Sequence, residues 1–228
     1  MSSFPNNGSL SRFQAFINDI YGLPDDRMFS IFDLLSNMER FTMRAIKGIR
    51  KGDPEKTRIN LLISFSWCMA IANRLHIDLE SIIWERFPDA CSYCGSEPCA
   101  CKSTKNTERV SLNPDPDKKP ISLSAFQDMF ERIYPSADRT LNSAGVHLAE
   151  ETGEVCEAIS VFLGEHKPDQ FKAIAEELAD YTSCLFGVAN SLPFSLADTL
   201  AEHYTDNCHA CHNAPCTCGF SYIAKFDS

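Results

Sequence analysis

The fold is decided by residues 148–188, which read LAEETGEVCEAISVFLGEHKPDQFKAIAEELADYTSCLFGV. Apolar residues recur at helical spacing in two runs, first Leu148, Val155, Ile159, Phe162 and Leu163, then Phe171, Ala175, Leu178 and Leu185. At about 100° per residue, each run falls on one side of a helix. Residues 164–168 begin with Gly and end with Pro, which breaks the pattern between the runs. We therefore predict a hairpin of two helices.

The N-terminal half shows the same periodicity. Helices are predicted over residues 28–47 and 56–75, and residues 48–54 supply the break between them. No segment alternates apolar and polar residues over a long run with β-branched enrichment, so we expect no sheet. The predicted fold class is all-α: a four-helix-bundle-like pseudo-dimer of two helical hairpin repeats, each ending in a metal loop of four cysteines, with the hairpins packed into one four-helix core.

The chain contains an internal repeat. The segment 9–14 (SLSRFQ) returns as 122–127 (SLSAFQ), and a four-cysteine pattern near residue 91 returns near residue 208. Residues 103–120 are rich in Asn, Asp, Lys and Pro, a composition that disfavours regular structure. We predict a first repeat over 1–102, a linker over 103–120 and a second repeat over 121–228.

Composition narrows the class of protein. The chain has 228 residues, of which 44% are hydrophobic, and this excludes a wholly disordered polymer. No N-terminal segment resembles a signal peptide, and the longest apolar run, residues 61–72, is too short to span a membrane. A formal net charge of -10 disfavours binding to polymeric nucleic acid. We expect a cytoplasmic protein without membrane passage.

Eight cysteines form two matched clusters with the spacing C-x2-C-x4-C-x-C. They are Cys91, Cys94, Cys99, Cys101, Cys208, Cys211, Cys216 and Cys218. Four thiolates within eleven residues suit one tetrahedral metal ion, and a closed shell of four thiolates is typical of structural zinc. An iron–sulfur cluster is the main rival, and paired disulfides are the ordinary alternative. His209 and His212 could replace a thiolate, but exposed loop histidines are the simpler interpretation.

Five acidic residues stand out in the second repeat: Glu150, Glu151, Glu154, Glu177 and Asp180. Residues three or four apart are neighbours on a helix, so two adjacent helices would bring these carboxylates together. A solvated acidic surface is the ordinary alternative. Against it, residues 148–165 contain no Lys or Arg, and Glu177 and Asp180 share a side with apolar residues. We expect a cation that the sequence does not supply, and oxygen ligands favour Mg²⁺ or Mn²⁺.

The segments 148–154 (LAEETGE) and 176–180 (EELAD) resemble the EExxE and ExxD motifs of the MazG-like, all-α nucleoside triphosphate pyrophosphohydrolases. The resemblance covers about residues 122–205, with a fainter echo in the first repeat and none in the cysteine loops. It implies Mg²⁺-dependent hydrolysis of a (d)NTP to a (d)NMP and pyrophosphate. It also implies that Glu151, Glu154, Glu177 and Asp180 bind Mg²⁺, and that Glu150 orients or deprotonates the attacking water.

The first repeat departs from this motif. Its equivalent positions fall among residues 36–41 and at Asn60 and Ile63, so we predict one active and one degenerate half. Residues 40–58 instead carry seven basic residues against two acidic ones, a local net charge of +5. From this segment Lys47, Arg50 and Lys51 are candidates for binding substrate phosphate, although surface ion pairs would equally explain them. Phe41 or Trp67 could wall a base pocket.

The resemblance implies a nucleoside triphosphate as partner and a possible homodimer. A non-catalytic nucleotide-binding or regulatory module, acting through its zinc loops, is the alternative function. A redox or iron–sulfur protein is the third possibility.

Overall fold

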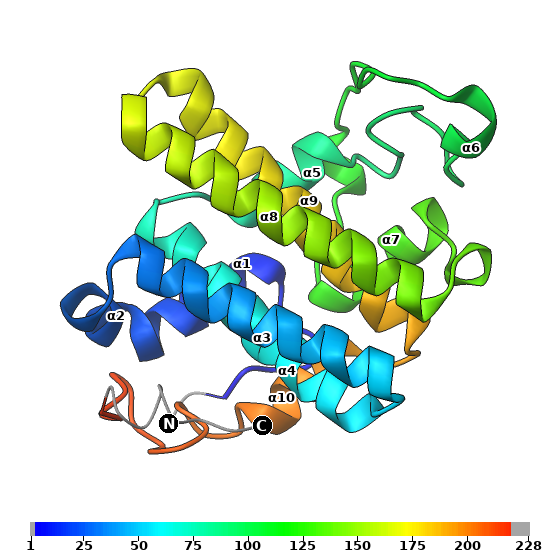
Figure 1. Ribbon diagram of the computed structural model, residues 1–228. Coiled ribbons are helices and arrows are strands. Elements are labelled where there is room, and N and C mark those ends of the chain that lie inside the picture. The colour runs from blue at the N-terminus through cyan, green and yellow to red at the C-terminus, as the bar shows by residue number, and fades with distance from the viewer. Residues whose placement is uncertain (1–2, 220–228) are drawn as a thin grey trace. The chain divides into compact units, whose positions relative to one another are not determined.

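The computed structural model describes residues 3–219, and within this range the regular structure is entirely helical (Figure 1). The prediction of an all-α fold is thus confirmed for the described residues. The chain divides into two compact units. Unit 1 holds the residues up to Asp78 and those from Leu196 onward, and unit 2 holds Leu79–Ser195.

Unit 1 is built around a hairpin of α3 (Ile31–Lys51) and α4 (Pro54–Arg74) (Figure 1). The hairpin turn follows from its sequence: Gly52 ends α3 at a φ of 64°, and the Asp53 side chain accepts the Lys56 amide at the start of α4. The remaining helices of this unit are α1 (Leu10–Ile17), a π-helical turn (Asn18–Gly22), α2 (Leu23–Met28) and α10 (Leu196–His203).

Unit 2 has its own hairpin, of α8 (Leu141–Glu165) and α9 (Pro168–Ser191) (Figure 1). Thr140 caps the start of α8 by accepting the Ser143 amide, and His166 ends it in the left-handed conformation with a φ of 57°. The other elements of unit 2 are α5 (Leu79–Arg86), α6 (Cys101–Thr104), a 3₁₀ turn (Pro116–Lys118), α7 (Leu123–Ile133) and a second 3₁₀ turn (Ser136–Asp138). The two predicted hairpins are therefore present, and their packing into one four-helix core stays a prediction.

Matching hydrogen bonds in the two units reflect the sequence repeat. In unit 1 the Gln14 side chain donates to the Ile77 carbonyl, and Asn73 donates to the Gln14 carbonyl. In unit 2 the Gln127 side chain donates to the Phe194 carbonyl, and Asn190 donates to the Gln127 carbonyl. These four contacts join the last turn of α4 or α9, and the residues just after it, to the first helix of the repeat. Equivalent glutamine and asparagine side chains therefore make the same hydrogen bonds in both copies.

Each compact unit combines parts of both sequence repeats. The amide of Cys99, in the first cysteine loop, donates to the carbonyl of Ile133 in the second repeat. Reciprocally, the amide of Cys216, in the second loop, donates to the carbonyl of Ile20 in the first repeat. The helices α5 and α10, which precede the loops, also pack in these units, against α9 and α4 respectively. Each repeat thus contributes its cysteine loop to the unit built on the other repeat's hairpin.

The compact units do not coincide with the predicted sequence repeats, whose assignment stays a prediction. Residues 1–102 and 121–228 describe the sequence repeats, but the boundaries between compact units fall at residues 78/79 and 195/196. The predicted linker, residues 103–120, lies inside unit 2 and forms little regular structure. It is held there because Arg109, Val110 and Asn106 contact the first cysteine loop.

Among residues 3–219, no single helix is both long and apolar enough to cross a membrane. The helices α9 and α10 meet that test of length and composition only when they are counted together across their break.

Candidate functional site

Three of the predicted carboxylates converge in unit 2. Glu151 comes from α8, whereas Glu177 and Asp180 come from successive turns of α9. One carboxylate oxygen from each residue lies within 4.8 Å of the others. Glu154 lies outside this group but interacts with Glu177, and Glu150 is exposed on α8. The predicted site is therefore assembled around three residues, with Glu154 beside Glu177 and Glu150 exposed outside the group.

Two arginines neutralise part of this cluster. Arg86, at the end of α5, donates from Nε to Asp180 Oδ1 at 2.7 Å and from Nη2 to Asp180 Oδ2 at 2.5 Å. Its Nη1 lies 3.1 Å from Glu176, and Arg109 Nη2 donates to Asp180 Oδ2 at 2.6 Å. The chain therefore supplies part of the compensating positive charge itself, and the expected metal cation stays a prediction. The compensating charges come from residues distant in sequence, which helical periodicity within 148–188 does not reveal.

Negative charge nevertheless remains in excess. Glu151 Oε2 and Glu177 Oε2 are buried and find no hydrogen-bond partner among residues 3–219. Burial, followed by the charge of Asp180, raises the pKa of Glu151 to about 8 and that of Glu177 to about 7. Burial acts to lower the pKa of Arg86, but its hydrogen bonds and charge interaction with Asp180 raise it. Buried carboxylate oxygens that lack hydrogen-bond partners and lie close together are suited to binding a hard divalent cation.

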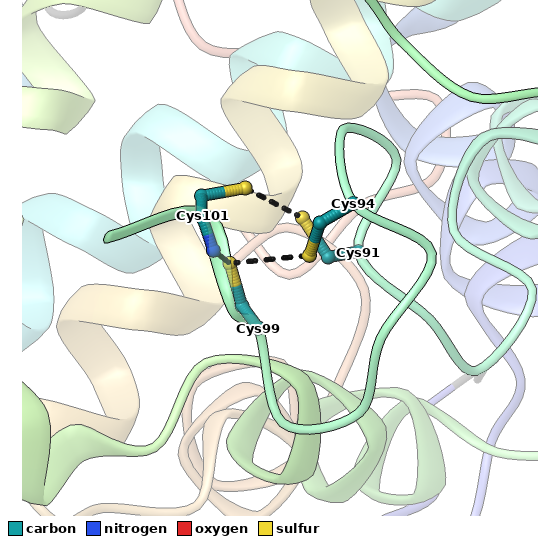
Figure 2. Close-up of side chains that lie close together, drawn as sticks. All are labelled: Cys91, Cys94, Cys99 and Cys101. Carbon is teal, nitrogen blue, oxygen red and sulfur yellow. Dashed lines mark hydrogen bonds between the residues drawn. The ribbon is translucent and has the colours of Figure 1, made fainter. Parts of the chain in front are cut away.

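The first cysteine loop brings its four thiols together (Figure 2). The Sγ atoms of Cys91 and Cys101 are 3.6 Å apart, and those of Cys94 and Cys99 are 3.9 Å apart. A tetrahedral zinc ion with Zn–S bonds of about 2.3 Å separates its sulfurs by about 3.8 Å. The Ala100 amide also donates to Cys94 Sγ at 3.2 Å, which stabilises a thiolate. This loop can therefore hold one tetrahedral metal ion such as zinc.

The second loop has a similar geometry, with one closer pair, because Cys216 Sγ lies 3.4 Å from Cys208 Sγ. Its sulfurs lie 3.9 Å apart for Cys208 and Cys218, and 3.7 Å apart for Cys211 and Cys216. The Thr217 amide donates to Cys211 Sγ at 3.4 Å, which repeats the contact made by Ala100 in the first loop. All eleven cysteines are free thiols in the structure, so neither cluster forms disulfides. In an iron–sulfur cluster the thiolates would bind several iron ions, whereas these spacings fit a single ion.

The histidines of the second loop lie outside its thiol group. His209 contacts Tyr21, whose hydroxyl lies 3.4 Å from His209 Nδ1 and also donates to Cys208 Sγ at 3.5 Å. The candidate metal group in this loop consists of its four cysteines. The thiolates alone therefore form the candidate shell. His212 is exposed, as predicted, whereas His209 is half-buried against Tyr21, so the prediction of exposed loop histidines is wrong for His209.

The basic residues predicted to bind phosphate lie in unit 1. Lys47, Arg50 and Lys51 are exposed in the last turns of α3. The two predicted base-pocket residues, Phe41 and Trp67, do line a common cavity of about 80 Å³ in unit 1. Tyr21, Ile63, Ala70 and Cys216 are also among its walls. A role for any of these residues toward nucleotide stays a prediction.

Sequence reasoning missed Arg86 and Arg109. Arg86 ends a short helix of the first repeat, and only the exchange of α5 into unit 2 brings it to Asp180. Arg109 lies in the stretch that its composition marked as a linker. One signal was available: Glu177 and Asp180 share a side of their helix with apolar residues, and buried carboxylates of this kind need cationic partners from elsewhere in the chain.

Comparisons with protein families, with curated proteins and with solved structures find no match to this chain.

Proposed function

We propose that the protein is a Mg²⁺-dependent nucleoside triphosphate pyrophosphohydrolase, an enzyme that converts a (d)NTP to a (d)NMP and pyrophosphate. The observation that carries this proposal is the convergence of Glu151, Glu177 and Asp180 within 4.8 Å, with two buried oxygens left unpartnered among the described residues. It agrees with the motif resemblance of residues 148–154 and 176–180. The same ligands would also bind Mn²⁺.

Glu151, Glu177 and Asp180 would hold the Mg²⁺, with Glu154 as an adjacent ligand. When bound, the ion would neutralise phosphate charge and lower the pKa of a coordinated water. The Arg86 side chain is only 8% exposed and donates two hydrogen bonds to Asp180, so it fixes the orientation of that carboxylate. Preorganised carboxylates of this kind need little rearrangement when the substrate binds.

The chemical step is a displacement at the α-phosphorus. A water oxygen forms a bond to that phosphorus, the bond from the phosphorus to the bridging oxygen breaks, and this oxygen leaves with pyrophosphate. The proton of the water passes to a carboxylate base. The resemblance gives this role to Glu150, which lies exposed on α8 directly before Glu151.

The two cysteine loops are proposed to hold structural zinc and to stabilise the units in which they lie. Each loop is fixed to a neighbouring helix by a backbone hydrogen bond, of 2.8 Å at Cys99 and 2.7 Å at Cys216. Four thiolates close the coordination shell, so these sites have no open position for substrate. Thiolate ligation of this kind suits a reducing compartment, and we place the protein in the cytoplasm.

A non-catalytic nucleotide-binding module is the second candidate. One observation favours it: Asp180 already has two guanidinium partners, so a metal ion must compete with Arg109 for one of its oxygens. Such a protein would bind nucleotide but release no pyrophosphate.

The test is incubation with a panel of NTPs and dNTPs plus Mg²⁺, with release of pyrophosphate as the readout. We expect Glu151→Gln to lower the rate by roughly 100-fold or more, because it removes a charged ligand from the centre of the cluster. Glu157→Gln is the matched control, because Glu157 is exposed on the same helix and lies outside the cluster. Absence of pyrophosphate from every nucleotide, or equal rates in wild type and Glu151→Gln, would refute the enzymatic proposal.

A further inference from the structure

Arg109 connects the first cysteine loop to the carboxylate cluster. Its Nη2 donates to Asp180 at 2.6 Å, and its Nη1 donates to the hydroxyl of Ser92, which lies between two loop cysteines. Its guanidinium carbon lies 4.2 Å from the centre of the Tyr93 ring, in a cation–π contact. One side chain therefore contacts both the loop and the carboxylates.

The loop fixes the backbone on either side of Arg109. The Val110 amide donates to the Ser92 carbonyl at 3.1 Å, and the Asn106 side chain donates to the Tyr93 carbonyl at 2.8 Å. Gly95 has a φ of 67°, and a Cβ at this position would lie 3.3 Å from Val110. The segment that carries Arg109 therefore packs closely against the loop. Its position depends on the fold that the four cysteines impose.

Arg86 and Arg109 differ in how they contact Asp180. The Arg86 side chain is 8% exposed and contacts both oxygens of Asp180. The Arg109 side chain is 32% exposed and contacts one of those oxygens, through one nitrogen. Asp180 would thus keep a two-point partner if Arg109 turned toward another anion. A guanidinium stacked on an aromatic ring at the edge of a carboxylate cluster is well suited to phosphate, because its planar fork can bind two phosphate oxygens.

We propose that the first cysteine loop and Arg109 form a polyphosphate subsite, in which the guanidinium binds phosphate oxygens of the substrate and Tyr93 supports it. This proposal rests on the proposed function, because it assigns the substrate's phosphate chain to the side of the carboxylate cluster where Arg109 lies. It gives the first loop a positioning role in the site in addition to its structural one. Lys47, Arg50 and Lys51 then become secondary candidates.

The test separates binding of the divalent cation from binding of the nucleotide. Both titrations use the zinc-loaded full chain. The first adds Mn²⁺ alone and is monitored by electron paramagnetic resonance. The second adds Mn²⁺ with a nucleoside triphosphate whose α,β-bridging oxygen is replaced by methylene, and is monitored by calorimetry. We expect Arg109→Gln to weaken binding of the analogue by about 10-fold or more, since a hydrogen bond between charged groups is lost. Mn²⁺ alone should bind equally or more tightly, because a competing cation has left Asp180.

Two further variants control for structure. Arg132→Gln removes an arginine that also pairs with the first loop region, at Asp89 and Glu97, but Arg132 makes no ion pair with the carboxylate cluster in the described residues. It should leave both titrations within twofold of wild type. Tyr93→Leu leaves the cysteines and Arg109 in place and should weaken only the analogue, by a smaller factor than Arg109→Gln.

The outcomes are distinct. Equal affinity for the analogue in wild type and Arg109→Gln overturns the subsite, as does an equal loss for Mn²⁺ alone and for the analogue, which would mark Arg109 as structural. If Arg109→Gln loses zinc or helical content, Tyr93→Leu decides, and an unchanged analogue affinity in that variant overturns the subsite. If the wild-type protein binds neither Mn²⁺ nor the analogue, the proposed function falls and the subsite falls with it.

Discussion

Unit 1 and unit 2 contain equivalent hairpins and equivalent cysteine loops, yet equivalent positions of the two hairpins carry apolar side chains in unit 1 and carboxylates in unit 2. The hairpin helices α3 and α8 align from their caps, Ser30 and Thr140. On both helices a buried threonine, Thr42 or Thr152, donates to the carbonyl four residues earlier. This alignment places Phe41 of unit 1 at the position of Glu151 in unit 2.

The partner helix completes the comparison. At the offset that relates the cysteine loops, Asn60 and Ile63 of α4 correspond to Glu177 and Asp180 of α9. Phe41 and Ile63 line the 80 Å³ cavity of unit 1, so an apolar hollow occupies the place where unit 2 has its carboxylates. The equivalent of Arg86 is His203. The scaffold is thus retained in both units, and a few side chains decide whether it can bind a cation.

The largest expected effect comes from breaking one loop at a time. Cys99→Ser and Cys216→Ser remove equivalent thiolates, and each should lower bound zinc from two ions per chain to one, as measured by elemental analysis. Activity should fall at least tenfold further in Cys99→Ser, because the first loop holds Arg109 beside Asp180. Equal activity losses in the two variants would mean that the loops serve stability alone.

Much of the fold could be predicted from sequence because it depends on local patterns. Helical spacing of apolar residues predicted the hairpins, and the repeated cysteine spacing predicted two matched loops whose sulfurs indeed converge. The exchange of the loops between repeats could not be predicted, because the sequence does not specify which Ile carbonyl, Ile20 or Ile133, accepts the Cys99 amide. The same limit hid Arg86 and Arg109, since side chains brought together from distant segments leave no periodic signal.

A second expected effect concerns the acid that borders the cavity of unit 1. Asp25 is 7% exposed, and burial raises its pKa from 3.8 to about 7, with Arg74 lowering it and Asp26 raising it. The folded state therefore favours the protonated form. This contribution to stability is complete below pH 3.8 and is lost as pH rises through about 7.

Asp25→Asn should thus stabilise the protein by roughly 1 to 3 kcal/mol at pH 8 and have little effect at pH 4, as measured by denaturant unfolding at the two pH values. The added stability from Mg²⁺ should be the same in wild type and Asp25→Asn, because this acid lies in unit 1 and the carboxylate cluster in unit 2. Greater stabilisation at pH 4 than at pH 8 would contradict the assignment of a raised pKa.

The smallest expected effect tests whether the basic segment of unit 1 contributes to substrate binding. Lys47, Arg50 and Lys51 are exposed, and exposed charges are screened by solvent and salt. Exchanging all three for Gln should raise KM for nucleotide by no more than about threefold. The effect should disappear near 0.5 M salt, where the Debye screening length is only about 4 Å. Arg109→Gln should raise KM further and retain more of its effect in salt, because Asp180 and Tyr93 contact that guanidinium and leave it 32% exposed. A tenfold or larger rise in KM for the triple variant, with little change for Arg109→Gln, would instead assign phosphate binding to unit 1.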